Sequence, residues 1–188
     1  MTRAIIIARR TLLWLLLVIG VGYGLLWYFQ RSLLYPARHY AEKEFRRQVE
    51  RQLGAKAELL PRFDALLFEP PPAAGAVAST AIWFHGNGDV NLDLAFVAPV
   101  FAARGIRLVL AEYPGYGARA GEPSQQLLVD DALALVVEVR RRWPGSALVL
   151  VGQSLGSGVA MQAAAALQGP AAPIRVALIT PYLSVAET

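Results

Sequence analysis

The chain has 188 residues, 55% of them hydrophobic, and its mean hydropathy of +0.40 excludes a disordered protein. The net charge of +4 arises from four arginines among the first 31 residues, and from Ser32 onward 14 basic side chains balance 14 acidic ones. This balance leaves no basic face for nucleic acid. The absence of cysteine excludes disulfides, thiolate metal sites and a cysteine nucleophile. Cysteine usage therefore gives no indication of an oxidising or a reducing compartment.

The first part of the chain has the pattern of a membrane span. Residues 11–30 carry no charge, are flanked by arginines, and are numerous enough to cross a bilayer. Trp14 and Trp27 lie near the two ends, where aromatic side chains meet the water interfaces of a membrane. A cleaved signal would need a shorter apolar core and small residues at a cleavage site, and a buried core helix is a further alternative. We predict an N-terminal anchor in residues 1–32.

The orientation of this span is not fixed by charge, because basic residues lie on both sides of it. For a bacterial source, we expect the N-terminus in the cytoplasm and the following domain outside the inner membrane.

Residues 33–56 form a predicted juxtamembrane linker with one short helix. Within 41–53, Phe45, Val49 and Leu53 recur every fourth residue, which indicates an amphipathic helix. Such a helix would lie on lipid headgroups or cap the domain, and a solvated spacer is the third reading.

Residues 57–188 alternate short apolar runs with helical stretches, a pattern that favours a doubly wound, mainly parallel α/β sheet. No internal repeat is evident. The expected strands are a strand or hairpin at 57–68 and single strands at 80–84, 106–111, 147–151 and 175–180. The expected helices are 92–104, 124–143 and 155–167, and the proline-rich residues 69–75 are a loop.

The motif with the strongest chemical content is Gly152-Gln153-Ser154-Leu155-Gly156, which stands between a predicted buried strand and an alanine-rich helix. A serine at such a junction sits on a sharp turn that raises its hydroxyl above the sheet. Side chains two residues before and after it would clash, so both positions need glycine. We predict Ser154 as a catalytic nucleophile and Gly152 and Gly156 as the glycines of its elbow.

A serine nucleophile also needs donors for the oxyanion of the tetrahedral intermediate. The backbone N–H of Leu155, which follows the nucleophile, is one candidate. The second is the N–H of Asn87 in the loop His85-Gly86-Asn87-Gly88, where glycines let the backbone approach a substrate closely. Two parts of one site therefore each follow a predicted strand.

These motifs resemble the α/β-hydrolase superfamily, and specifically its serine-aminopeptidase-like branch, which includes membrane-anchored lipases and thioesterases. The resemblance runs from about residue 33 to the end. It rests on Leu33-Leu34-Tyr35-Pro36, the 85–88 loop, Tyr113-Pro114-Gly115-Tyr116-Gly117, the 152–156 elbow and Thr180-Pro181-Tyr182. It implies a nucleophilic Ser154 and small-molecule, lipid or peptidyl acyl substrates bearing ester, thioester or amide bonds, with no cofactor and no metal.

The chain departs from the superfamily in its acid and base, which should follow the serine in the order Asp or Glu, then His. After Ser154 the sequence contains one acid, Glu187, and no histidine. His39 is interpreted as an interfacial polar residue, and His85 as a residue that orders its turn by hydrogen bonding. A serine without an adjacent base is a poor nucleophile, so we expect little or no activity from residues 1–188. The interpretation is a C-terminally truncated hydrolase, with a non-catalytic membrane protein of the same fold as the alternative.

Three other features receive structural interpretations. Residues 113–117 are a demanding turn, and Asp130 and Asp131 are a solvated helix face or a hydrogen bond that braces a loop. The arginines 140–142 favour the end of a helix dipole. A phosphate-binding loop is excluded because Lys43 and Lys56 are the only lysines and neither lies in a glycine-rich motif.

Overall fold

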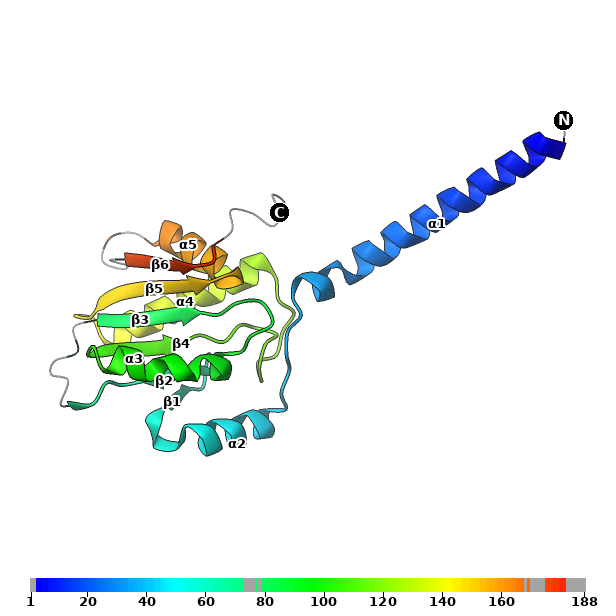
Figure 1. The fold of residues 1–188 in the computed structure, drawn as a ribbon. Coiled ribbons are helices and arrows are strands. Elements are labelled where there is room, and N and C mark those ends of the chain that lie inside the picture. Colours follow the sequence, from blue (N-terminus) through cyan, green and yellow to red (C-terminus); the bar gives the residue numbers. More distant parts are fainter. Residues whose placement is uncertain (1–2, 73–76, 78, 168, 170–174, 182–188) are drawn as a thin grey trace. The chain divides into compact units, whose positions relative to one another are not determined.

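The computed structural model describes residues 3–72, 77, 79–167, 169 and 175–181 (Figure 1). The chain divides into two compact units, Met1–Pro36 and Ala37–Thr188. The second unit includes residues 37–56, which the sequence analysis assigned to a linker. Within that segment, helix α2 (Glu42–Gln52) buries Phe45 and Val49, and the 3-10 helix η1 (Gly54–Lys56) follows it.

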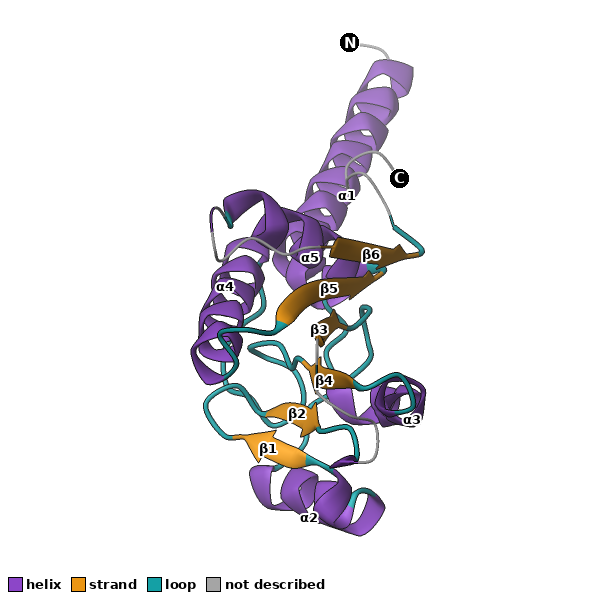
Figure 2. Cartoon of the chain, turned by 90° about the vertical axis from the view of Figure 1, so that its left-hand side faces the viewer, coloured by secondary structure: helices purple, strands orange, loops and turns teal. Residues whose placement is uncertain are grey.

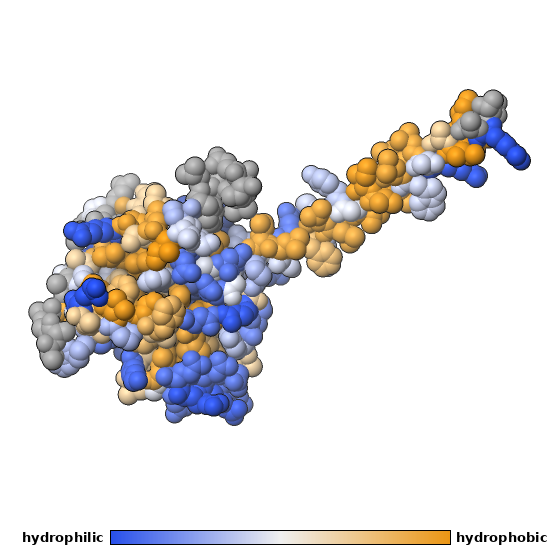
Figure 3. All heavy atoms as spheres, in the orientation of Figure 1, coloured by the Kyte–Doolittle hydropathy of each residue, from blue (hydrophilic) through white to orange (hydrophobic). Residues whose placement is uncertain are grey.

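Helix α1 (Arg3–Leu34) makes up the first unit. Its stretch Ile5–Gln30 has 26 residues and a mean hydropathy of 2.0, so it is long and apolar enough to cross a membrane. Hydrophobic side chains cover most of its surface in Figure 3, and none of its most apolar window is buried. Among the described residues it is the one helix that meets these criteria, which a signal sequence near an N-terminus also meets. Length and composition thus fit the predicted span, and anchoring itself stays a prediction.

The second unit is built on a six-stranded sheet in the order β1-β2-β4-β3-β5-β6. Strands β2 and β4 pair antiparallel, as do β1 and β2, whereas β3 pairs parallel with β4 and β5, and β5 with β6. The strands are β1 (Glu58–Leu60), β2 (Ala65–Phe68), β3 (Ser79–Phe84), β4 (Ile106–Leu110), β5 (Ala147–Gln153) and β6 (Arg175–Ile179). The predicted doubly wound, mainly parallel sheet is confirmed, and 57–68 is the predicted hairpin.

Helices cover both faces of this sheet, and Figure 2 shows α3 (Ala98–Ala102) and α4 (Gln125–Arg142) on opposite sides. On the α3 side, Phe45 and Val49 of α2 join one buried cluster with Leu66, Trp83 and other side chains of the sheet. Helix α2 therefore caps the domain, because its apolar face is buried in this core and is not free to lie on headgroups or in solvent.

The remaining helices follow the expected ranges with one difference. Helix α5 (Leu155–Ala166) agrees with the prediction, and Ser124 caps α4 by accepting a hydrogen bond from the Leu127 amide at 3.3 Å. The expected single helix 92–104 is wrong. A 3-10 helix, η3 (Asn91–Val97), precedes the five-residue α3 there. Pro99 explains the break, because proline has no N–H to continue a preceding α-helix.

Strand β6 lies at one edge of the sheet, paired with β5. Leu178 and Ile179 on this strand are 37% and 40% exposed. The described part of the chain therefore presents an apolar strand edge. Residues 182–188, which include Tyr182 and Glu187, lie outside the described residues.

Candidate active site

The candidate site lies at the carboxyl ends of β3 and β5, two neighbouring interior strands of the sheet. The chain leaves β3 toward β4 on one side and reaches β5 on the other, so this pair marks the point where the strand order reverses. In open α/β sheets, ligands bind in the crevice at such a point. The loop after β3 and the turn after β5 carry the motifs that the sequence singled out.

Ser154 occupies the turn between β5 and α5 with φ 48° and ψ −116°, a backbone conformation that residues with side chains rarely adopt. The flanking glycines make this turn possible. A Cβ at Gly152 would lie 2.4 Å from the Gly156 carbonyl oxygen, and a Cβ at Gly156 would lie 2.1 Å from the Phe84 carbonyl oxygen. The sequence therefore places a serine on a sharp bend at the tip of a central strand, where it is half-buried.

Backbone hydrogen bonds hold this turn. The Ser154 amide donates to the Ile179 carbonyl of β6 at 2.9 Å, and the Ser154 carbonyl accepts from the Ser157 amide at 2.8 Å. The Ser157 hydroxyl donates to the same carbonyl. No hydrogen bond joins the Ser154 hydroxyl to another side chain of the described residues. The turn is thus fixed from both sides while the hydroxyl stays available for chemistry.

The loop after β3 lies directly beside this serine. A Cβ built on Gly86 would be 3.6 Å from Ser154 Cβ and 3.0 Å from an Asp89 carboxylate oxygen. Asn87 is exposed, and its side-chain oxygen accepts from the Tyr116 hydroxyl at 2.8 Å. Leu155 follows Ser154 directly, and Asn87 follows Gly86, the residue of the loop that lies against Ser154. Their backbone amides stay predicted oxyanion donors.

His85 begins this loop and is completely buried against Glu112. Its Nδ1 lies 2.8 Å from the Gly86 carbonyl oxygen, and its Nε2 lies 2.9 Å from Glu112 Oε1. A carbonyl oxygen only accepts, so the contact with Gly86 uses Nδ1 as the donor, and the contact with Glu112 uses Nε2. Both ring nitrogens are thus engaged away from Ser154, as the interpretation of His85 as a turn-ordering residue requires.

Glu112 joins several parts of the site, and the sequence analysis gave it no role. Its carboxylate accepts from the amides of Asn91 at 3.2 Å and Tyr113 at 3.1 Å, in addition to its contact with His85. The available signal was a lone acid directly after the apolar run of β4. A buried carboxylate at that position has to find donors, and the nearest are the amides of adjacent loops.

The turn at 113–117 braces the loop after β3. The Tyr113 hydroxyl donates to the His85 carbonyl at 2.9 Å, and both Tyr113 and Tyr116 are buried with their rings against the His85 ring. Arg119 donates to the Glu112 carbonyl at 2.6 Å and grips Asp131 through two hydrogen bonds of 2.6 and 2.8 Å. These contacts give 113–117 a structural role and Asp131 the loop-bracing hydrogen bond, both as expected.

The other residues weighed in the sequence lie apart from Ser154 in their contacts. His39 is exposed and forms a backbone bridge with Gly117. The arginines at the end of α4 pair with Glu138, Glu58 and the Ser146 carbonyl. Among the described residues, no group of three or more His, Cys, Asp or Glu side chains could hold a metal ion.

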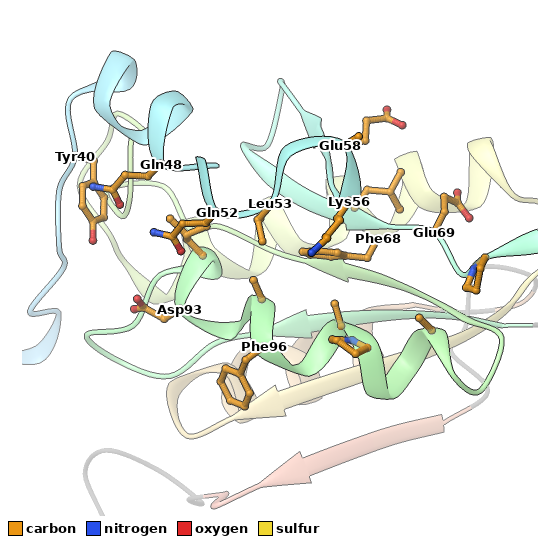
Figure 4. Close-up of a pocket in the computed structure, with 18 residues that line it drawn as sticks. Tyr40, Gln48, Gln52, Leu53, Lys56, Glu58, Phe68, Glu69, Asp93 and Phe96 are labelled. Atoms are coloured by element: carbon orange, nitrogen blue, oxygen red, sulfur yellow. The ribbon is translucent and has the colours of Figure 1, made fainter. Parts of the chain in front are cut away.

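A groove of about 980 Å³ lies between α2, η1 and the η3–α3 segment (Figure 4). Tyr40, Leu53, Phe68 and Phe96 contribute apolar surface to it, and Lys56 lies among its polar side chains. None of the predicted site residues lines this groove. It is therefore separate from the candidate active site, and the turn-and-loop arrangement around Ser154 has to carry the functional argument.

A serine on a glycine-flanked turn after a central parallel strand, beside a glycine-rich loop from the neighbouring strand, defines an α/β-hydrolase. Residues 75–188 match the model of the family described as serine aminopeptidase, S33, and the chain belongs to this family.

Curated relatives and solved structures agree with this assignment. The chain is 28% identical over 130 residues to lysophosphatidylserine lipase ABHD12 of Gallus gallus, covering 66% of this chain and 33% of that protein. It is 28% identical over 156 residues to protein bem46 of Schizosaccharomyces pombe, covering 75% and 50%. An α/β serine hydrolase without a lid from Xanthomonas campestris superposes with TM-score 0.54 at 28% identity, covering 62% of this chain and 55% of that one. The chain thus spans a third to about half of these proteins.

Proposed function

We propose that this chain carries the nucleophile and oxyanion hole of a serine hydrolase that cleaves ester, thioester or amide bonds through an acyl-enzyme on Ser154. The observation that carries the proposal is the Ser154 backbone, held at φ 48° beside the loop that contains Asn87. That strained conformation stays in place because backbone bonds and two glycines determine it, which is typical of functional sites.

In the proposed reaction, the Ser154 oxygen attacks the acyl carbon, and the carbonyl oxygen takes up the negative charge beside the Asn87 and Leu155 amides. The bond to the leaving alcohol, thiol or amine then breaks, and this leaving group takes up the proton that the Ser154 hydroxyl lost. Water then attacks the acyl-enzyme, which releases the acid and restores the Ser154 hydroxyl. Within residues 1–188, Glu187 is the one acid after Ser154 and no histidine follows it, so the proposal assigns to this chain the nucleophile and the oxyanion hole. The substrates proposed are small-molecule, lipid or peptidyl acyl compounds.

The experiment is covalent labelling of the full chain in membranes with a fluorophosphonate, followed by peptide mapping. We expect an adduct on Ser154 that is absent from Ser154→Ala. Ser124→Ala is the matched control, because this serine caps α4 and should leave labelling unchanged. Equal labelling of wild type and Ser154→Ala would remove Ser154 from the mechanism. A second reaction, with an acyl thioester, should add one acyl group to the same peptide.

A non-catalytic role is the second candidate, and one observation favours it. Both nitrogens of the buried His85 are engaged by Gly86 and Glu112, and among the described residues no hydrogen bond joins either imidazole to Ser154. In that case the chain would bind acyl compounds without turnover. Absence of any adduct in the full chain, together with retained binding of an uncleavable acyl analogue, would select this function.

We also propose that α1 anchors the chain in a membrane through residues 11–30, with the N-terminus in the cytoplasm and the domain on the other side of a bacterial inner membrane. The uncharged length of Ile5–Gln30 supports the anchor. Because the chain lacks cysteine, a single cysteine at Arg62 or at Thr2 can report the side with a membrane-impermeant maleimide. Release by carbonate washing would defeat the anchor, and labelling of Thr2→Cys alone in intact cells would reverse the orientation.

A further inference from the structure

Residues 38–40, close to the start of the second unit, pair with the turn that follows β4. The Gly117 amide donates to the Arg38 carbonyl at 2.9 Å, and the Tyr40 amide donates to the Gly117 carbonyl at 2.7 Å. His39 and Gly117 thereby form an isolated parallel bridge. These two hydrogen bonds fix residues 38–40 along the 113–117 turn, which braces the loop after β3.

The Arg38 side chain reaches the loop after β3. Its Nε donates to the Gly88 carbonyl at 3.0 Å, and its guanidinium forms an ion pair with Asp93. Gly88 has φ +81° and directly follows Asn87, the proposed oxyanion donor. Asp93 in turn accepts from the Val90 amide at 3.2 Å, where the loop continues into η3. One arginine therefore holds the loop at its glycine and at the start of the next helix.

The loop after β3 and the 113–117 turn both contact Glu112, so a shift of one affects the position of the other. Glu112 contacts His85 through Oε1 at 2.9 Å and accepts from the Asn91 amide through Oε2 at 3.2 Å, so it grips the loop after β3 at both ends. A Cβ at Gly117 would lie only 2.6 Å from Oε2, so Gly117 packs directly on the same carboxylate. A displacement of residues 38–40 consequently acts on Gly88 directly and on His85 through Gly117 and Glu112.

We propose that Arg38 is a positioning residue that sets the conformation of the His85–Gly88 loop, and that residues 38–40 form a strap that holds this loop and the 113–117 turn together. This inference rests on the proposed function, in which the Asn87 amide faces the oxyanion. Without the guanidinium, the Gly88 carbonyl loses its protein donor and turns toward water, and the Asn87 peptide turns with it. Arg38 follows the last residue of α1 by four positions of sequence.

The test compares Arg38→Ala and Arg38→Lys with Arg46→Ala in the full chain, reconstituted in detergent micelles. Arg46 is the matched control because its side chain is 47% exposed against 48% for Arg38, and it also makes one ion pair and one Nε hydrogen bond, both within α2 to Glu42. The first readout is amide hydrogen exchange by mass spectrometry, which reports local opening without requiring catalysis.

In Arg38→Ala we expect exchange to accelerate by about 10-fold or more in peptides covering 85–93 and 113–118, and to stay unchanged in β3 and β5. Arg38→Lys should give an intermediate effect, because an ammonium can keep the ion pair with Asp93 but has no planar fork to serve both acceptors. Arg46→Ala should leave both loops as in wild type. Unchanged exchange in 85–93, or acceleration spread evenly over the sheet, would overturn the proposal.

The second readout is the rate of fluorophosphonate labelling at Ser154. We expect a decrease of about 10-fold or more in Arg38→Ala, since small misplacements at a reacting centre reduce rates by such factors. Local loosening with no labelling in any variant, wild type included, would uphold the positioning role and reject the hydrolase proposal. Normal labelling in Arg38→Ala would reject the positioning role and uphold the hydrolase.

Discussion

Gly156 provides the sharpest test of the elbow geometry. A Cβ at this position would lie 2.1 Å from the Phe84 carbonyl oxygen, 2.5 Å from the Phe84 carbonyl carbon and 2.7 Å from the His85 carbonyl oxygen. All three atoms belong to backbone, so no side chain can rotate away to make room. To reach ordinary contact, α5 and the end of β3 would have to separate by about 1 Å, which a close-packed interior resists.

We expect Gly156→Ala to lower the free energy of unfolding by about 3 kcal/mol, the upper part of the range for overpacking. For a chain of this size that corresponds to a fall in melting temperature of roughly 6–12 °C. The assay is thermal unfolding of the full chain in detergent, followed by the fluorescence of its tryptophans.

Gly145→Ala is the control, because an added Cβ there meets nothing within 4 Å. Its melting temperature should stay within about 2 °C of wild type, as for most surface substitutions. If Gly156→Ala melted as Gly145→Ala does, α5 would not pack against the end of β3 as described, and the explanation of the glycine requirement would fail.

Three further variants each test one contribution to stability. Ser154→Gly should be more stable than Ser154→Ala by about 1–3 kcal/mol, because glycine adopts φ 48° without strain, and equal melting temperatures would show an unstrained turn. Hydrogen bonds from Arg141 and Arg142 lower the pKa of Glu138 from 4.5 to about 2, so Glu138 adds stability above pH 5 that is lost as the pH falls toward 2. Glu138→Gln should therefore cost about 1 kcal/mol or less at pH 7, with the difference in melting temperature vanishing near pH 2. Burial raises the pKa of Asp64 above its ordinary 3.8, so the free energy of unfolding falls as the pH rises through the raised pKa. The melting temperature of Asp64→Asn should therefore exceed that of wild type at pH 7 and equal it below pH 3.8. A difference in melting temperature that does not change with pH would refute this.

The strands and the elbow were predictable because their signals are local. Residues 147–151 form a short apolar run between turn residues, which is typical of an interior strand that helices cover on both faces. The glycines at 152 and 156 are required by contacts within a few residues and with the adjacent strand, so the motif and its context determine the turn.

The helical segment after β3 was predicted less well. Apolar spacing over 92–104 indicates a helix, but it does not show where a 3-10 segment gives way to α-helix. Pro99 was the available signal, because it removes the hydrogen bond that a continuous helix would need. For α2 the spacing of Phe45 and Val49 gave the helix but not its partner, since an amphipathic face fits lipid and protein equally well.

The supporting residues of the site could not be derived from spacing. Arg38 contacts Gly88 across 50 positions of sequence, and His85 contacts Glu112 across 27. Such pairs depend on which loops the sheet order brings together, and a single sequence does not encode that order in any local pattern. Glu112 received no role from the sequence, because its donors lie in loops that only the folded sheet brings to it.

The bond between the Ser154 amide and the Ile179 carbonyl sets an order of events during biosynthesis. Strands β3, β4 and β5 emerge from the ribosome before β6, and domains form progressively as the chain is made. Until β6 has emerged and paired, the Ser154 amide lacks its acceptor, and the φ 48° backbone of Ser154 lacks that support. The contact between His85 and Glu112 needs only the loops after β3 and β4, so it does not depend on β6.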